Sequence, residues 1–174
     1  MSGPGLTELS RLAADVVAAL KSRGLTIATA EATTGGLIGH LITSAPGSSA
    51  VFRGGVAPYS NAMKRAIGVP PETLDQFGAV SMEAAAALAQ AIRAFAGADI
   101  GLAETGIAGP AGGTTERPAG TFWLAIAAAD AIPTERLSLA GERVPNQQAC
   151  AAAALRMLLR HLPQLTPPPP ERKV

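Results

Sequence analysis

The sequence predicts an α/β fold, a three-layer α/β/α sandwich around a mixed, mostly parallel central sheet. Segments with apolar residues at helical spacing alternate with short apolar runs along most of the chain, and that alternation is typical of helices that cover both faces of a sheet. Two strand-like segments then follow one another directly, which favours a mixed sheet over a wholly parallel one.

Length and C-terminal composition predict one domain followed by a tail. The 174 residues fit a single domain, which we place at residues 1–162, with no internal repeat and no linker. Residues 163–174 include four consecutive prolines, and this composition predicts a disordered tail.

The N-terminal segments indicate a helix, a strand and a second helix. Apolar residues recur at helical spacing over Leu6–Arg23, and a glycine ends the pattern. Leu25–Glu31 is apolar enough for a strand that is covered on both faces. A helix is expected over Gly35–Ser44, with Thr33 or Thr34 as its cap.

The rest of the chain continues with short segments of both kinds. Ser81 is a suitable N-cap with Glu83 in the first helical turn, and Pro145 suits a first turn. The remaining expected elements are a strand at Val51–Tyr59, short helices at Asn61–Ile67 and from Pro70, a helix from Ser81 to Ala96, strands at Asp99–Glu104, Gly120–Ala129 and Glu135–Leu139, and a last helix from Pro145 to His161.

Composition excludes several classes of function. The net charge of +1 shows no excess that would favour nucleic acid or a membrane surface. No apolar run approaches the ~20 residues of a membrane span, and no secretion signal is recognisable, so a cytoplasmic protein is expected. Cys150 is the single cysteine, which excludes an internal disulfide, and we expect it to be a small core residue.

Two glycine-rich turns carry the chemical signal. The segment Thr29–Ile38 leads from a strand through a Thr/Gly turn into a helix, which gathers backbone N–H groups and a positive helix end at a place suited to a phosphate or an oxyanion. Thr105–Thr114 follows another strand and is equally rich in glycine. Because ligands bind at the carboxyl edge of open α/β sheets, we expect a small anionic ligand there. No side chains have metal-ligand spacing, so no metal is expected, and we expect no cofactor.

Several motifs occur in order: PGSSAVFRGGV at residues 46–56, YSN at 59–61, GVPPETL at 68–74 and TGIAGPAGG at 105–113. Together they resemble the CinA C-terminal domain family, the competence/damage-inducible proteins that include the bacterial nicotinamide mononucleotide deamidases. The resemblance covers Leu6 to Leu162. The N-terminal domain of longer members is absent from it, so the resemblance implies the stand-alone amidohydrolase type.

The resemblance implies amide hydrolysis, in which nicotinamide mononucleotide and water give nicotinic acid mononucleotide and ammonia. The family pattern has a serine nucleophile in an A-E-S-C-T-G-G motif and a lysine base in a Y-S-N-x-x-K segment. Aligning the motifs places Ala32 at the serine and Thr33 at the cysteine, whereas Lys64 is retained. Glu104 stands at a position that is usually apolar in the family.

The alignment and its departures together give the candidate site. The candidate catalytic positions are Ala32, at the position of the family serine, and Lys64, Thr33, Tyr59 and Glu104. The implied substrate-binding positions are Glu31, Thr34, Gly35, Gly36, Asn61, Thr105, Gly106, Gly109, Gly112, Gly113 and Arg143.

Three interpretations of the missing serine remain open. Thr33 supplies the hydroxyl in the first, although a neighbouring residue on a tight turn points elsewhere. The second is a nucleotide-binding sensor or partner protein without turnover. In the third, Glu31 and Glu104 share a proton and one of them activates water; the alternative is that Glu104 pairs with Lys64 or an arginine. A homo-oligomer is expected, and the number of subunits stays open.

Overall fold

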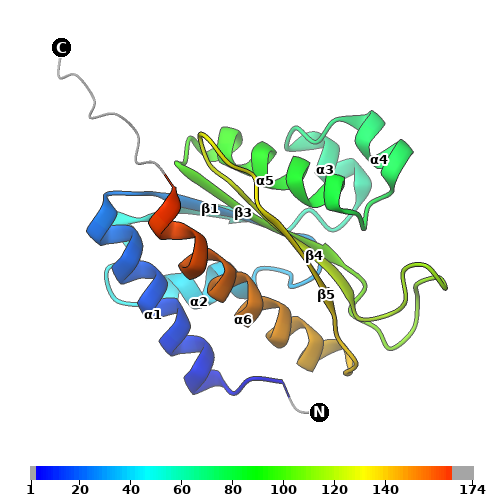
Figure 1. The fold of residues 1–174 in the computed structure, drawn as a ribbon, viewed down its shortest axis with the longest axis horizontal. Helices are drawn as coiled ribbons and strands as arrows, with labels where there is room; N and C mark the ends of the chain where they lie inside the picture. The colour runs from blue at the N-terminus through cyan, green and yellow to red at the C-terminus, as the bar shows by residue number, and fades with distance from the viewer. Residues whose placement is uncertain (1–2, 166–174) are drawn as a thin grey trace.

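The computed structural model describes residues 3–165, and its centre is one five-stranded sheet (Figure 1). The strands are β1 (Ile27–Glu31), β2 (Phe52–Val56), β3 (Ile100–Gly106), β4 (Thr121–Ala127) and β5 (Thr134–Ser138). They lie in the order β2-β1-β3-β4-β5. β1 is parallel to both of its neighbours, whereas β4 is antiparallel to both of its own. Four of the five strands therefore run in one direction, and the predicted mixed, mostly parallel sheet is confirmed.

Helices cover both faces of the sheet, as the three-layer prediction requires (Figure 1). One face carries α1 (Leu6–Arg23), α2 (Leu37–Ser44) and α6 (Arg143–His161). The opposite face carries α3 (Asn61–Ala66), α4 (Pro71–Phe77) and the longer α5 (Met82–Ala96). Short 3-10 turns lie at Ser48–Ala50 and Leu162–Gln164.

The two faces of the sheet bury different kinds of side chain. Large aliphatic residues such as Leu20, Leu102 and Leu155 fill the core beneath α1, α2 and α6. The core beneath α5 is rich in alanine, including Ala30 and Ala103 from the sheet. Small residues on that face let α5 lie close to the strands, because side-chain volume sets the distance between packed layers.

At Gly101, β3 lies against the backbone of α5. A Cβ at this position would collide with the carbonyl oxygen of Ala89 and with the Cβ of Arg93. We expect Gly101→Val to lower the free energy of unfolding by about 3 kcal/mol, since overpacking in a filled core costs ~1–3 kcal/mol and this contact is with backbone. Urea unfolding monitored by circular dichroism measures the loss. Ser138→Val, on the exposed edge of β5, is the control and should stay within about 0.5 kcal/mol of the wild type; equal stability of both variants would contradict the packing account.

The C-terminal segment differs in part from the predicted tail. Pro163 and Gln164 belong to a 3-10 turn, and Leu165 is buried in the core beside α1 and α6. An apolar residue close behind the last helix can bury its side chain against that helix, and the prediction from composition did not account for this. The rest of the predicted tail, 166–174, lies outside the described residues.

Across residues 3–165, no helix is both long and apolar enough to cross a membrane. Cys150 is buried on α6 and is a free thiol, in agreement with the core role expected for it.

Candidate active site

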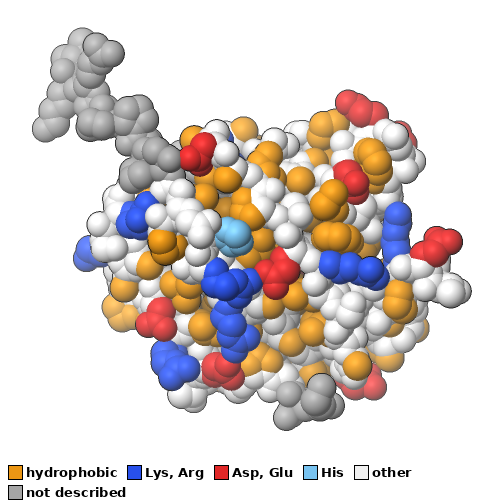
Figure 2. Space-filling model, viewed as in Figure 1, with side chains coloured by type: hydrophobic (Ala, Val, Ile, Leu, Met, Phe, Trp, Pro, Cys, Tyr) orange, Lys and Arg blue, Asp and Glu red, His pale blue; other side chains and the backbone are white. Residues whose placement is uncertain are grey.

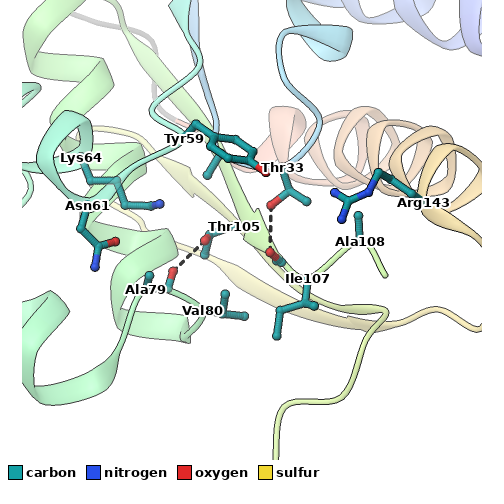
Figure 3. A pocket seen from close by; sticks show the side chains of 12 residues that line it. Thr33, Tyr59, Asn61, Lys64, Ala79, Val80, Thr105, Ile107, Ala108 and Arg143 are labelled. Carbon is teal, nitrogen blue, oxygen red and sulfur yellow. Dashed lines mark hydrogen bonds between the residues drawn. The ribbon is translucent and has the colours of Figure 1, made fainter. Parts of the chain in front are cut away.

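The strand connections create a crevice at the carboxyl ends of β1 and β2, beside that of β3. The chain leaves β1 through α2 on one face, whereas it leaves β2 through α3 on the other face. At such a switch point the loops separate to opposite sides and leave room for a ligand. A cavity of about 330 Å³ opens there (Figure 3). Its lining consists of Ala32, Thr33, Tyr59, Asn61, Lys64, Ala79, Val80, Thr105, Gly106, Ile107, Ala108 and Arg143.

Two basic side chains reach the cavity from different layers. Lys64 belongs to α3, whose first turn is capped by the Ser60 hydroxyl accepting from the Met63 amide at 3.2 Å. Only 4 % of Lys64 is exposed, and its side chain points into the cavity (Figure 3). Arg143 is the first residue of α6 and lies on the other side of the same cavity.

Burial changes the protonation chemistry of Lys64. Loss of hydration lowers the pKa of its amine below the ordinary value of 10.5, and the charge of Glu104 opposes part of this shift. A lysine with a lowered pKa holds more neutral amine near neutral pH and is therefore a better proton acceptor. Among the described residues, no carboxylate lies within ion-pair distance of the Lys64 ammonium.

Glu104 lies fully buried beneath the turn that follows β1. Its Oε1 accepts from the Thr33 amide at 2.6 Å, the Thr34 amide at 2.7 Å and the Thr34 hydroxyl at 3.0 Å. Its Oε2 accepts from no described residue. Burial raises the pKa of the Glu104 carboxyl above its ordinary value, the hydrogen bonds from Thr33 and Thr34 oppose the shift, and the negative charge of Glu31 adds to it.

Glu31 is the acceptor at the N-terminus of α2. Its Oε2 accepts from the amides of Gly36 at 3.1 Å and Ile38 at 2.8 Å and from the Thr34 hydroxyl at 2.8 Å, and its Oε1 accepts from the Gly39 amide at 2.8 Å. A carboxylate satisfies the free amides and the positive end of a helix together. Glu31 therefore caps α2, and the expected threonine cap is wrong because the N-cap is Gly36 without a side-chain cap.

The amides of the Thr/Gly turn point toward carboxylates of the protein. The sequence led us to expect that they would donate to a bound anion, whereas Thr33, Thr34 and Gly36 donate to Glu104 and Glu31. The two glutamates are direct partners in the β1–β3 register. The signal available in the sequence was an acidic residue at the end of each of two predicted strands, Glu31 and Glu104.

The structure brings together about half of the predicted site residues. Ala32, Thr33, Tyr59, Asn61, Lys64, Thr105, Gly106 and Arg143 line one cavity. Glu31, Thr34, Gly35, Gly36, Glu104, Gly109, Gly112 and Gly113 are outside its lining. Ala79, Val80, Ile107 and Ala108 also line the cavity, and sequence reasoning missed them because apolar side chains carry no chemical signal.

The glycine-rich loop after β3 is held by one contact from α6 and by a bridge within the loop. Asn146 is buried on α6, and its side-chain amide donates to the carbonyls of Ala108 and Gly141 at 2.8 Å each. Gly113 forms an isolated bridge with Pro118. Asn146 thus fixes the part of the loop that borders the cavity, and it was not among the predicted site residues.

Thr33 is engaged on three sides. Its hydroxyl donates to the Gly106 carbonyl at 3.1 Å (Figure 3), its amide donates to Glu104, and its carbonyl accepts from the Gln147 side chain at 2.7 Å. The neighbouring Ala32 presents only a methyl group to the cavity. These hydrogen bonds fix the position of the turn. The Thr33 hydroxyl, which lines the cavity, donates its hydrogen bond to a backbone carbonyl.

Titration of Glu104 gives stability a pH dependence. Because its folded pKa is raised, folding is favoured when Glu104 is protonated, and this contribution is lost as pH rises from about 4.5 through the folded pKa. Glu104→Gln keeps an acceptor for the two amides but does not titrate. We expect the stability of this variant relative to the wild type to increase from pH 4 to pH 8, as measured by urea unfolding. A constant difference over that range would contradict the raised pKa.

The fold is an open α/β sandwich with a lysine-lined cavity at the carboxyl edge of its sheet, the edge at which proteins of this fold class bind ligands. The sequence profile described as the CinA C-terminal domain matches residues 9–162, and the chain belongs to this family.

The relatives include two curated proteins of greater length. The chain is 48 % identical over 145 residues to a putative competence-damage inducible protein of Halothermothrix orenii. The aligned region covers 82 % of this chain and 35 % of the relative. It is 46 % identical over 153 residues to a CinA-like protein of Myxococcus xanthus, covering 86 % of this chain and 36 % of the relative. The chain thus spans about a third of the length of these relatives.

Solved structures share the whole fold. The competence/damage inducible protein CihA of Agrobacterium tumefaciens superposes with a TM-score of 0.87 at 36 % identity, over 94 % of this chain and 99 % of that one. The competence damage-inducible protein A of Klebsiella pneumoniae gives a TM-score of 0.87 at 34 % identity, over 91 % of this chain and 99 % of that one.

Proposed function

We propose that the cavity binds a pyridine mononucleotide of the nicotinamide mononucleotide type and that amide hydrolysis at this site is residual. The observation that supports the proposal best is that the buried Lys64 and the methyl-bearing Ala32 line the same cavity. In this proposal Lys64 is the base that an amidohydrolase needs, and Ala32 lacks the hydroxyl group that this base would deprotonate.

The lining suits the parts of such a ligand. Arg143 offers a planar guanidinium that can donate two parallel hydrogen bonds to a phosphate. Tyr59 is 77 % exposed at the cavity, where its ring is free to stack on a pyridine. Asn61 provides both a donor and an acceptor for a carboxamide.

Neither of the other candidate groups replaces the serine. Nucleophilic attack requires a base that takes the hydroxyl proton, and the Thr33 hydroxyl donates to a backbone carbonyl, which is not a base. Glu104 is outside the cavity lining and holds the turn through Oε1. A bound amide would therefore meet no activated nucleophile of the protein.

Binding is tested by titration calorimetry with nicotinamide mononucleotide. We expect Arg143→Met to weaken binding about 10-fold or more, because a hydrogen bond to a charged group contributes ~1.5–3 kcal/mol. Arg11→Gln is the matched control, since Arg11 lies exposed on α1 outside the cavity, and it should bind as the wild type does. Equal affinities of the wild type and the Arg143→Met variant for the nucleotide would show that Arg143 does not bind the phosphate.

Thr33→Val tests the alternative nucleophile. We expect the residual release of ammonia from nicotinamide mononucleotide to stay within about twofold of the wild-type rate, because the hydroxyl lacks a base. A glutamate-dehydrogenase-coupled assay measures the ammonia. If the Thr33→Val variant releases ammonia at least about 100-fold more slowly than the wild type and still binds the nucleotide, Thr33 is the nucleophile.

A further inference from the structure

A second cavity adjoins the candidate active site. It has a volume of about 300 Å³, and Val80 lines both cavities. The other lining residues are Ser81, Met82, Glu83, Glu116, Arg117, Trp123 and Arg136. Trp123 pairs in register with Thr105 on the neighbouring strand, and Thr105 lines the first cavity. The two cavities are therefore neighbours along the same end of the sheet.

Polar side chains of the second cavity do not satisfy one another. Within residues 3–165, no hydrogen bond or ion pair engages the side chains of Glu83, Glu116 and Arg136 or the indole N–H of Trp123. Arg117 is different, because its guanidinium donates to the Phe77 carbonyl at 2.7 Å and so supports the wall of the cavity. The cavity thus combines unpaired donors and acceptors with a half-buried aromatic ring.

This combination fits a nucleoside. An indole face stacks on a heterocyclic base, and such stacking tolerates any base. A guanidinium and carboxylates bind the polar edge of a base and the hydroxyls of a ribose. The lining has two arginines and two glutamates, so their charges cancel and the cavity favours a neutral group over a bare anion. On the molecular face in Figure 2, basic and acidic side chains are likewise interspersed.

Size also favours a ligand that extends through both cavities. Each has a volume near the lower limit of the ~300–1,000 Å³ that is typical of small-molecule sites. We infer that the site accepts a pyridine dinucleotide. Its nicotinamide mononucleotide half occupies the first cavity, its second nucleoside stacks on Trp123, and its linking phosphates pass over Val80. This inference rests on the proposed function of the first cavity.

Fluorescence of Trp123 makes the second cavity directly observable, because it is the only tryptophan in the chain. In the test, the wild-type protein is titrated with oxidised nicotinamide adenine dinucleotide and, separately, with nicotinamide mononucleotide. Fluorescence follows the Trp123 emission, and calorimetry measures each affinity. We expect the dinucleotide to bind at least about 10-fold more tightly, since one stacked base contributes that much, and to change the Trp123 emission. The mononucleotide should bind without changing it.

Arg136→Gln separates the two cavities. This variant should weaken dinucleotide binding by about 5-fold or more and leave mononucleotide affinity unchanged, whereas Arg11→Gln should alter neither. Equal affinity for both nucleotides with no change in Trp123 emission would overturn the inference and leave the proposed function intact. If neither nucleotide binds, both fail. A dinucleotide that changes the emission while the mononucleotide does not bind would support the second cavity and count against the first.

Discussion

Ala32→Ser is expected to raise the rate of ammonia release from nicotinamide mononucleotide by at least about 100-fold, because it supplies a hydroxyl in the same cavity as a lysine that can act as its base. Ala32 lines the cavity together with Lys64, and the added oxygen replaces one methyl hydrogen without disturbing the turn. The turn itself is fixed by the Glu104 and Gly106 hydrogen bonds. Ammonia release measured against the wild type gives the gain directly.

Two controls assign that gain to Lys64. Ala32→Ser combined with Lys64→Met should return to the wild-type rate, since methionine retains the length of the side chain without the amine. In the single Ala32→Ser variant the rate should rise with pH as the Lys64 ammonium loses its proton, and it should level off below the ordinary lysine pKa of 10.5. If the Ala32→Ser protein binds the nucleotide but releases no additional ammonia, Lys64 does not act as a base for a hydroxyl at this position.

Glu104→Leu is expected to lower the free energy of unfolding by about 2–5 kcal/mol. The substitution removes the acceptor for the Thr33 and Thr34 amides, and each buried donor left without a partner costs ~1–3 kcal/mol. Leucine has a similar volume, so cavity formation contributes little. Urea unfolding followed by circular dichroism at pH 7 measures the loss.

Glu104→Gln distinguishes the acceptor role from mere volume. The glutamine oxygen retains the bonds to both amides, and this variant should stay within about 1 kcal/mol of the wild type at pH 7. The turn also positions Ala32, so Glu104→Leu should abolish most of the activity gained by Ala32→Ser while Glu104→Gln retains it. A Glu104→Leu protein as stable as the wild type would show that Glu104 does not anchor the turn.

Sequence patterns were most informative where a segment is long and strongly periodic. The bounds predicted for the first helix, Leu6–Arg23, are those of α1, because six buried apolar residues share one face and a left-handed glycine follows. The sheet class was predictable for a similar reason, since apolar runs alternate with helices. The predicted strand at Val51–Tyr59 is shorter in the structure and ends at Val56, where pairing with β1 stops.

Long-range contacts account for what the sequence could not provide. The start of α2 is set by Glu31, whose position in the preceding strand gives no local capping signal. The direction of the turn amides depends on Glu104, which is distant in sequence and adjacent only through β-pairing. Lys64 and Arg143 were identifiable as candidates from their motifs, yet their meeting in one cavity follows from the strand order.

The wild-type protein is expected to bind an intact carboxamide nucleotide and to cleave it only at a residual rate. Nuclear magnetic resonance of nicotinamide mononucleotide labelled with ¹⁵N in its carboxamide tests binding and cleavage in one sample. We predict that the amide resonance shifts or broadens with stoichiometric protein while labelled ammonium stays a small fraction of the nucleotide over hours. An unchanged resonance would contradict binding at this cavity, and rapid accumulation of labelled ammonium would contradict the loss of the nucleophile.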